Sequence, residues 1–167
     1  MNNLGKWKGI IFILTIIFFV ACGLYRASLN VKTPLTDRIS NYETVLIYVT
    51  TMVPDSAEQA SILEEYIIKN LNKKAIFKKV VASSAEPDAS TDLRLNAKIL
   101  NLKKAGIVST MFTGGGGGVI VEVSLIDVKT GATIGTFESR RSSGSSTTKD
   151  VLFDVAKRMA EYMKENM

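Results

Sequence analysis

The sequence predicts an α+β domain, a two-layer sandwich in which two helices cover one face of a mixed or antiparallel sheet of four to five strands. Two observations carry this prediction. Strand-like segments rich in β-branched residues follow one another through the middle of the chain, and two segments repeat their apolar residues at helical spacing. The predicted order is strand, helix, three or four strands and helix. This order indicates a single α+β domain that spans residues 42–167.

The first predicted strand spans residues 43–51 and is apolar on both faces, which indicates a central strand covered on both sides. A helix is expected to follow, with Asp55 as its N-cap and Glu58 completing a capping box. Its buried stripe is predicted to be Ala60, Leu63, Ile67 and Leu71.

Four further segments complete the predicted domain. Strands are expected at residues 75–81, 92–104, 119–128 and 132–140, and a helix at residues 149–166 with the buried stripe Leu152, Val155, Ala156, Met159 and Met163. In the 92–104 strand the apolar phase slips by one residue after Ile99. Either a β-bulge near Ile99-Leu100 keeps the later leucines on the core side, or the strand ends there. Gly131 is expected to adopt positive φ in a tight turn between the last two strands.

The N-terminus has the features of a secretory signal. Lys6 and Lys8 precede an apolar run at residues 10–21, which ends at Cys22, the only cysteine of the chain. Phe19-Val20-Ala21-Cys22 resembles the lipobox of bacterial lipoproteins. The resemblance implies that residues 1–21 are removed and that Cys22 carries three fatty chains, palmitate among them, on a tether of residues 22–41.

Two other interpretations of this segment stay open. The 17 uncharged residues between Lys8 and Arg26 reach the lower limit for an uncleaved anchor helix, and the cysteine could follow an ordinary secretory signal by chance. If the lipobox holds, Gly23 in place of aspartate implies, by the family's sorting rule, an outer-membrane location facing the periplasm in a Gram-negative cell.

Composition excludes several functional classes. The chain has no histidine, so a Ser-His-Asp triad is impossible, and with its one cysteine assigned to lipid no His/Cys metal site is expected. Loss of Lys6 and Lys8 with the signal lowers the net charge from +5 to +3, which does not indicate nucleic-acid binding. Ser-Lys and carboxylate-only chemistry stay open, but nothing in the sequence points to them, and we expect neither a cofactor nor an enzyme.

Two local motifs are candidates for binding. Gly114, Gly115, Gly116, Gly117 and Gly118 are followed by Val119 and a strand, so they do not form a phosphate loop. With Met111 and Phe112 beside them they form either a plain connection or a loop that contacts a partner. Arg140-Arg141 and the Ser/Gly run behind them could bind an anion, although the pattern favours a solvated strand end.

The segment from Asp92-Leu93-Arg94-Leu95 to Asp127-Val128-Lys129-Thr130-Gly131 resembles a family of small bacterial lipoproteins of uncharacterised function. That family in turn resembles the periplasmic domain of the curli secretion channel lipoprotein and the N-terminal domain of TolB. The resemblance implies an envelope-assembly or surface-associated role, with other envelope proteins or further copies of the chain as partners. A weaker likeness of residues 22–26 to the lipopolysaccharide-assembly lipoprotein offers an alternative.

We therefore expect a membrane-anchored, non-enzymatic binding or assembly module. A module that binds a small ligand or lipid between helices and sheet is the alternative, and an apolar pocket of at least about 300 Å³ there would support it.

Overall fold

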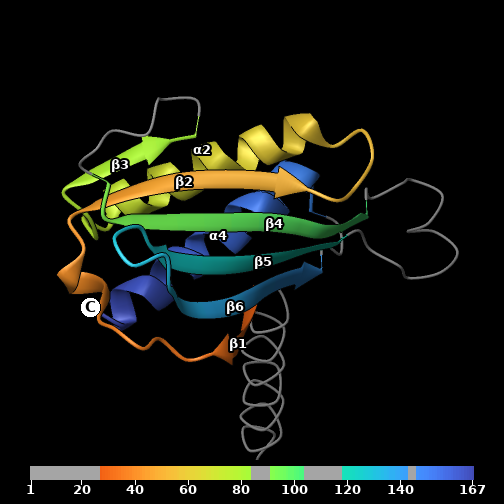
Figure 1. Cartoon of the computed structure of the whole chain (residues 1–167). Helices are drawn as coiled ribbons and strands as arrows, with labels where there is room; N and C mark the ends of the chain where they lie inside the picture. Colours follow the sequence, from red (N-terminus) through yellow and green to blue (C-terminus); the bar gives the residue numbers. More distant parts are fainter. Residues whose placement is uncertain (1–26, 84–90, 104–117, 143–145) are drawn as a thin grey trace, which may run out of the picture.

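The computed structural model describes residues 27–83, 91–103, 118–142 and 146–167. These residues form a six-stranded sheet with both α-helices on one face (Figure 1). The strands are β1 (Ser28–Thr33), β2 (Thr44–Thr51), β3 (Lys79–Ala82), β4 (Leu93–Lys103), β5 (Gly118–Asp127) and β6 (Thr133–Ser142); the helices are α2 (Ala57–Lys73) and α4 (Thr148–Glu165), and a short 3-10 helix, η1 (Ile39–Asn41), precedes β2. The predicted α+β sandwich is confirmed, with one strand more than expected.

The sheet is mixed, with the strand order β1-β6-β5-β4-β2-β3. β2 runs parallel to both of its neighbours, β3 and β4, and the other pairs are antiparallel. A parallel pair needs a crossover connection, and α2 supplies it between β2 and β3.

The core lies between the helices and the sheet. Both predicted helix stripes are buried there, as are the alternating residues of the central strands: Leu93, Leu95, Ala97 and Ile99 of β4 and Val119, Val121, Val123 and Leu125 of β5. These apolar side chains form the core between the two layers, and both pockets described for this chain lie at the ends of the sheet.

The phase slip in β4 is a β-bulge. Ile99 lies opposite Val121, whereas Asn101 lies opposite the very next partner, Ile120, so Leu100 is the extra residue. Leu102 thereby returns to the core face, where it packs against the core. The alternative that the strand ends near residue 99 is wrong, because β4 continues to Lys103.

The predicted tether is wrong from residue 28 onward. Residues 28–33 form β1, the edge strand, and pair with β6 from Ser28 opposite Arg140 to Thr33 opposite Thr136. In β1 only Leu29 is half-buried, so the strand carries no apolar alternation and depends on its backbone hydrogen bonds to β6.

β2 was expected to be covered on both sides, and this expectation is also wrong. Its residues Leu46 and Tyr48 point away from the helices, and Tyr48 is 49% exposed. A sheet with both helices on one face leaves the other face to solvent.

The start of α2 differs from the predicted capping box. Ser56, not Asp55, is the N-cap, and it makes no side-chain cap hydrogen bond; its hydroxyl donates instead to the carbonyl oxygen of Val53 at 2.6 Å. A capping box is present at the start of α4, between Thr147 and Asp150. The strand predicted at residues 75–81 is shorter and later than expected, since β3 begins at Lys79.

Within the described ranges, neither helix is long and apolar enough to cross a bilayer.

Candidate functional site

The sheet has two ends with different chemistry. At one end β4 and β6 finish and β1 and β5 begin; we call it the groove end. At the other end lie η1 and the turn between β5 and β6; we call it the turn end. Each end carries a pocket.

The pocket at the turn end has a volume of about 340 Å³. It is lined by Asp37, Asn41, Tyr42, Thr91, Asp92, Asp127, Val128 and Lys129. At its centre is the Tyr42 hydroxyl, which lies 3.1 Å from Oδ2 of Asp37 and 3.1 Å from Oδ2 of Asp127. A phenol has one proton, so it donates to one of the two carboxylates at a time. Burial, followed by these carboxylates, raises the pKa of Tyr42 and keeps the phenol neutral.

The aspartates of this pocket hold the backbone in place. Oδ2 of Asp92 accepts hydrogen bonds from the amides of Glu43 at 3.2 Å and Thr44 at 3.1 Å, where β2 starts beside β4. Oδ1 of Asp127 accepts a hydrogen bond from the amide of Thr130 at 2.8 Å and so stabilises the β5–β6 turn. That amide is the main reason why the pKa of Asp127 is lowered.

The turn end is therefore a structural junction that joins β2, β4 and the β5–β6 turn. Its carboxylates are committed to backbone amides and to Tyr42. In the four described ranges, no group of three or more acidic, cysteine or histidine side chains has the geometry to hold a metal ion.

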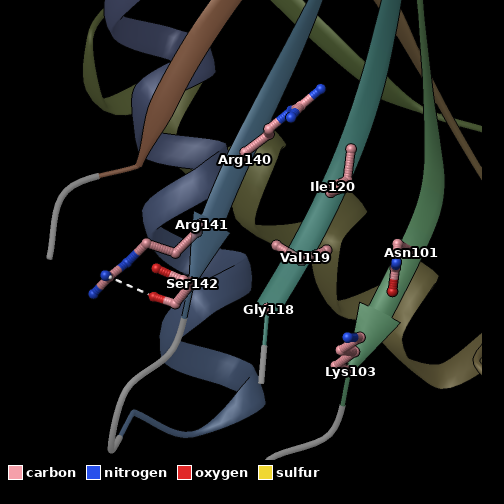
Figure 2. A pocket seen from close by; sticks show the side chains of 8 residues that line it. All are labelled: Asn101, Lys103, Gly118, Val119, Ile120, Arg140, Arg141 and Ser142. Atoms are coloured by element: carbon pink, nitrogen blue, oxygen red, sulfur yellow. Dashed lines mark hydrogen bonds between the residues drawn. The ribbon is translucent and has the colours of Figure 1, made fainter. Parts of the chain in front are cut away.

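The pocket at the groove end is an open groove of about 280 Å³ across the ends of three strands. Figure 2 shows its lining residues: Asn101, Lys103, Gly118, Val119, Ile120, Arg140, Arg141 and Ser142. The register places Lys103, Gly118 and Ser142 in one row on the sheet face away from the helices, and Asn101, Ile120 and Arg140 in the next row. Donor groups of β4 and β6 therefore stand on either side of Gly118, which has no side chain to separate them.

The two arginines of the groove end have different roles, because successive strand residues point to opposite faces (Figure 2). Arg141 faces the helices and is buried, with Nε bonded to Oδ2 of Asp154 in α4 at 2.9 Å and Nη1 bonded to the carbonyl oxygen of Ser142 at 2.9 Å. It joins β6 to α4. Arg140 lies on the opposite face, where 57% of its side chain is exposed and its Nε bonds the carboxylate of Glu138.

A small ion-pair network connects the groove to β1. Glu138 is buried, and the Arg140 guanidinium, followed by Lys32, lowers its pKa. Lys32 of β1 bonds Glu122 and lies 3.5 Å from Oε2 of Glu138. Glu122 and Glu138 are directly opposite each other in the sheet, so Lys32 offsets the repulsion between two like charges.

The sequence-predicted site residues lie mostly outside the described residues. This holds for Cys22 and for Met111, Phe112, Gly114, Gly115, Gly116 and Gly117. Gly118 is described: it is the first residue of β5 and lies in the floor of the groove. Sequence reasoning singled out Arg140-Arg141 but missed Asn101 and Lys103, whose polar alternation in β4 was the available signal.

No protein-family model matches this chain, and no curated protein matches it in sequence. Solved structures share its fold at low identity. PelC from Paraburkholderia phytofirmans, solved as a dodecamer, is similar with a TM-score of 0.64 at 13% identity, over 83% of this chain and 97% of PelC. XCC0632 from Xanthomonas campestris, of the family DUF330, has a TM-score of 0.50 at 10% identity, over 80% of this chain and 91% of its own. A looser likeness, with a TM-score of 0.46 at 12% identity, covers 74% of this chain and 99% of lipoprotein GNA1162 from Neisseria meningitidis.

Proposed function

We propose that this chain is a lipid-anchored protein of the bacterial cell envelope, acylated at Cys22, whose domain binds and assembles other envelope components and catalyses no reaction. In a Gram-negative cell its place is the outer membrane, facing the periplasm. The observation that carries the proposal is the short distance along the chain between the lipobox cysteine and the fold.

Cys22 lies six residues before Ser28, the first residue of β1. Six extended residues span at most about 20 Å. An acylated Cys22 would therefore hold the β1 edge of the sheet close to the bilayer surface, without room for a long tether. Two or more acyl chains are enough for stable attachment.

Assembly is supported by the fold likeness to PelC, which was solved as a dodecamer. β1 lies at the edge of the sheet and, among the described strands, pairs only with β6. An exposed strand edge is a common site for adding a strand of another chain. Self-association through such a surface fits a small binding module. The likeness to the curli channel lipoprotein and to TolB stays a prediction.

The anchor is tested by metabolic labelling with an alkyne analogue of palmitate. We expect the wild-type protein to be labelled in whole membranes and Cys22→Ser to be unlabelled. Label on the serine variant, or an unmodified thiol on an intact wild-type chain by mass spectrometry, contradicts the anchor.

Assembly is tested on the full-length protein in detergent by size-exclusion chromatography with light scattering. We expect a multiple of the protomer mass. A monomeric wild-type protein, with only monomer recovered after crosslinking in whole cells, contradicts self-association.

A further inference from the structure

The groove at the end of β4, β5 and β6 has the chemistry of an anion site. Its two sides are separated by two strand spacings, about 10 Å, which long basic side chains on β4 and β6 bridge readily. The floor is Gly118, where a Cβ would lie 3.0 Å from the carbonyl oxygen of Arg141. Any larger residue there would fill the hollow between the donors of β4 and those of β6.

Within the described ranges, the fold leaves some donors of the groove lining without a carboxylate partner. No carboxylate of the described ranges pairs with the ammonium group of Lys103, which is exposed. Arg140 extends away from Gly118 along β6 (Figure 2), and its Nε bonds the carboxylate of Glu138. Its guanidinium carries four further N–H groups. Asn101 and Ser142 add an amide and a hydroxyl at the same sheet end. Spare Arg and Lys donors around a small hollow suit a phosphate group.

The position of the groove indicates where the phosphate comes from. Ser28 lies opposite Arg140 in the register, and its hydroxyl is 3.5 Å from the Arg140 carbonyl oxygen. The chain that reaches back to Cys22 therefore leaves the fold beside the wall of the groove. If Cys22 is acylated, lipid headgroups lie within about 20 Å of this point.

We propose that the groove binds the phosphate of an anionic phospholipid headgroup in the membrane that holds the protein. The proposal rests on the lipid anchor proposed above, and it gives the domain a defined orientation, with the groove end toward the bilayer and the turn end away from it. Arg140 and Lys103 bind the phosphate, and Gly118 leaves the space for it. Arg141 positions the end of β6 through Asp154.

The test is native mass spectrometry of the full-length protein in neutral detergent, with phosphatidylglycerol or phosphatidylcholine of the same acyl chains added. We expect more bound phosphatidylglycerol than phosphatidylcholine. Each basic residue near an anionic lipid surface contributes enough to change affinity about fivefold, so the double variant Lys103→Gln/Arg140→Gln is expected to lose roughly 25-fold. Gly118→Val should reduce binding without removing a charge.

The matched control is Arg38→Gln/Lys129→Gln, which removes the same two charges from exposed positions at the turn end. It is expected to bind phosphatidylglycerol like the wild type. Equal losses in the two double variants would mean that binding follows net charge alone, and would overturn the proposal. Equal binding of the two lipids would overturn it as well.

A third arm uses inorganic phosphate, measured by isothermal titration under the same conditions. Binding of free phosphate as tight as that of phosphatidylglycerol would assign the groove to a soluble anion and contradict the membrane source. The anchor can fail separately: an unlabelled Cys22 contradicts acylation, whereas headgroup binding is measured on the full chain in detergent with or without acyl chains. Thermal unfolding of each variant, followed by circular dichroism, verifies that a loss of binding is not a loss of folding.

Discussion

The turn end and the groove end carry pockets of similar size, about 340 and 280 Å³, but they use their polar groups differently. At the turn end Asp92 and Asp127 accept backbone hydrogen bonds, and Tyr42 lies between two carboxylates. At the groove end Lys103 has no carboxylate partner in the described ranges, and Arg140 retains N–H groups beyond its bond to Glu138.

This difference shows that a cluster of charged residues is informative only when its hydrogen bonds are counted. The acidic cluster resembles a reactive site until each oxygen is assigned, and then it explains how β2, β4 and the β5–β6 turn are joined. In the groove, Lys103 and Arg140 keep N–H donors that no described carboxylate accepts, so these donors are available to a ligand. Substitutions should therefore affect stability at the turn end and ligand binding at the groove end.

The largest effect on stability is expected for Asp92→Ala. The change leaves the amides of Glu43 and Thr44 without their acceptor, and Thr44 is only 8% exposed. Unsatisfied buried donors cost about 1–3 kcal/mol each, so we expect the free energy of unfolding to fall by about 2–3 kcal/mol. Urea unfolding measures it, and Asp92→Asn, which keeps one acceptor oxygen, should lose less. Wild-type stability for the alanine variant would contradict the structural role of Asp92.

Tyr42→Phe is expected to lower the free energy of unfolding by about 1 kcal/mol, the usual net value of one hydrogen bond. The ring stays buried, while the hydroxyl between Asp37 and Asp127 is lost.

The stability of the same variant at alkaline pH is a second measurement. The folded pKa of Tyr42 is raised above its unfolded value, so its contribution is present below the unfolded pKa and declines as the pH rises through it. Above about pH 10 the wild type should lose stability more steeply than the phenylalanine variant. Parallel pH curves would contradict this assignment.

Asp127→Asn tests the same junction in acid. The folded pKa of Asp127 is lowered, chiefly by the amide of Thr130, so the carboxylate contributes stability above its unfolded pKa and loses it as the pH falls through the folded pKa. Urea unfolding from pH 7 down to about pH 2 should therefore show a smaller acid loss for the asparagine variant than for the wild type. Identical acid profiles would assign the acid sensitivity to other carboxylates, such as Asp150 of the α4 capping box, whose pKa is also lowered.

The sequence was sufficient to predict the core of this fold, because buried residues recur at the regular spacing of a helix or a strand. The stripes of α2 and α4 follow from the spacing of apolar residues alone, whereas the phase slip in β4 left a bulge and an early strand end as alternatives until the register was known. β1 has no such spacing. Its sequence, Ser-Leu-Asn-Val-Lys-Thr, reads as a polar connection, and only pairing with β6 makes it a strand.

The two pockets could not be predicted for a related reason. Lys103, Gly118 and Ser142 are far apart in the sequence and become neighbours only through the register of three strands. A register is set by strand pairing and by the bulge at Leu100, and a shift of one residue would have moved Lys103 to the core face. The predicted N-cap at Asp55 was wrong for a local reason. Asp55 has a positive φ of 54°, which makes it part of a turn, so the N-cap is Ser56.

The smallest effect on stability is expected for Lys103→Gln, and this makes it the sharpest test of the comparison. The side chain is exposed and has no ion-pair partner in the described part of the chain, so the free energy of unfolding should stay within about 0.5 kcal/mol of the wild type. The same protein should bind phosphatidylglycerol about fivefold more weakly. A substitution that leaves the fold unchanged and weakens ligand binding is the reverse of Asp92→Ala, which weakens the fold at the end where no ligand is proposed. If Lys103→Gln instead destabilised the protein in urea by as much as Asp92→Ala, the groove end would be a structural junction like the turn end, and the two ends would not differ in function.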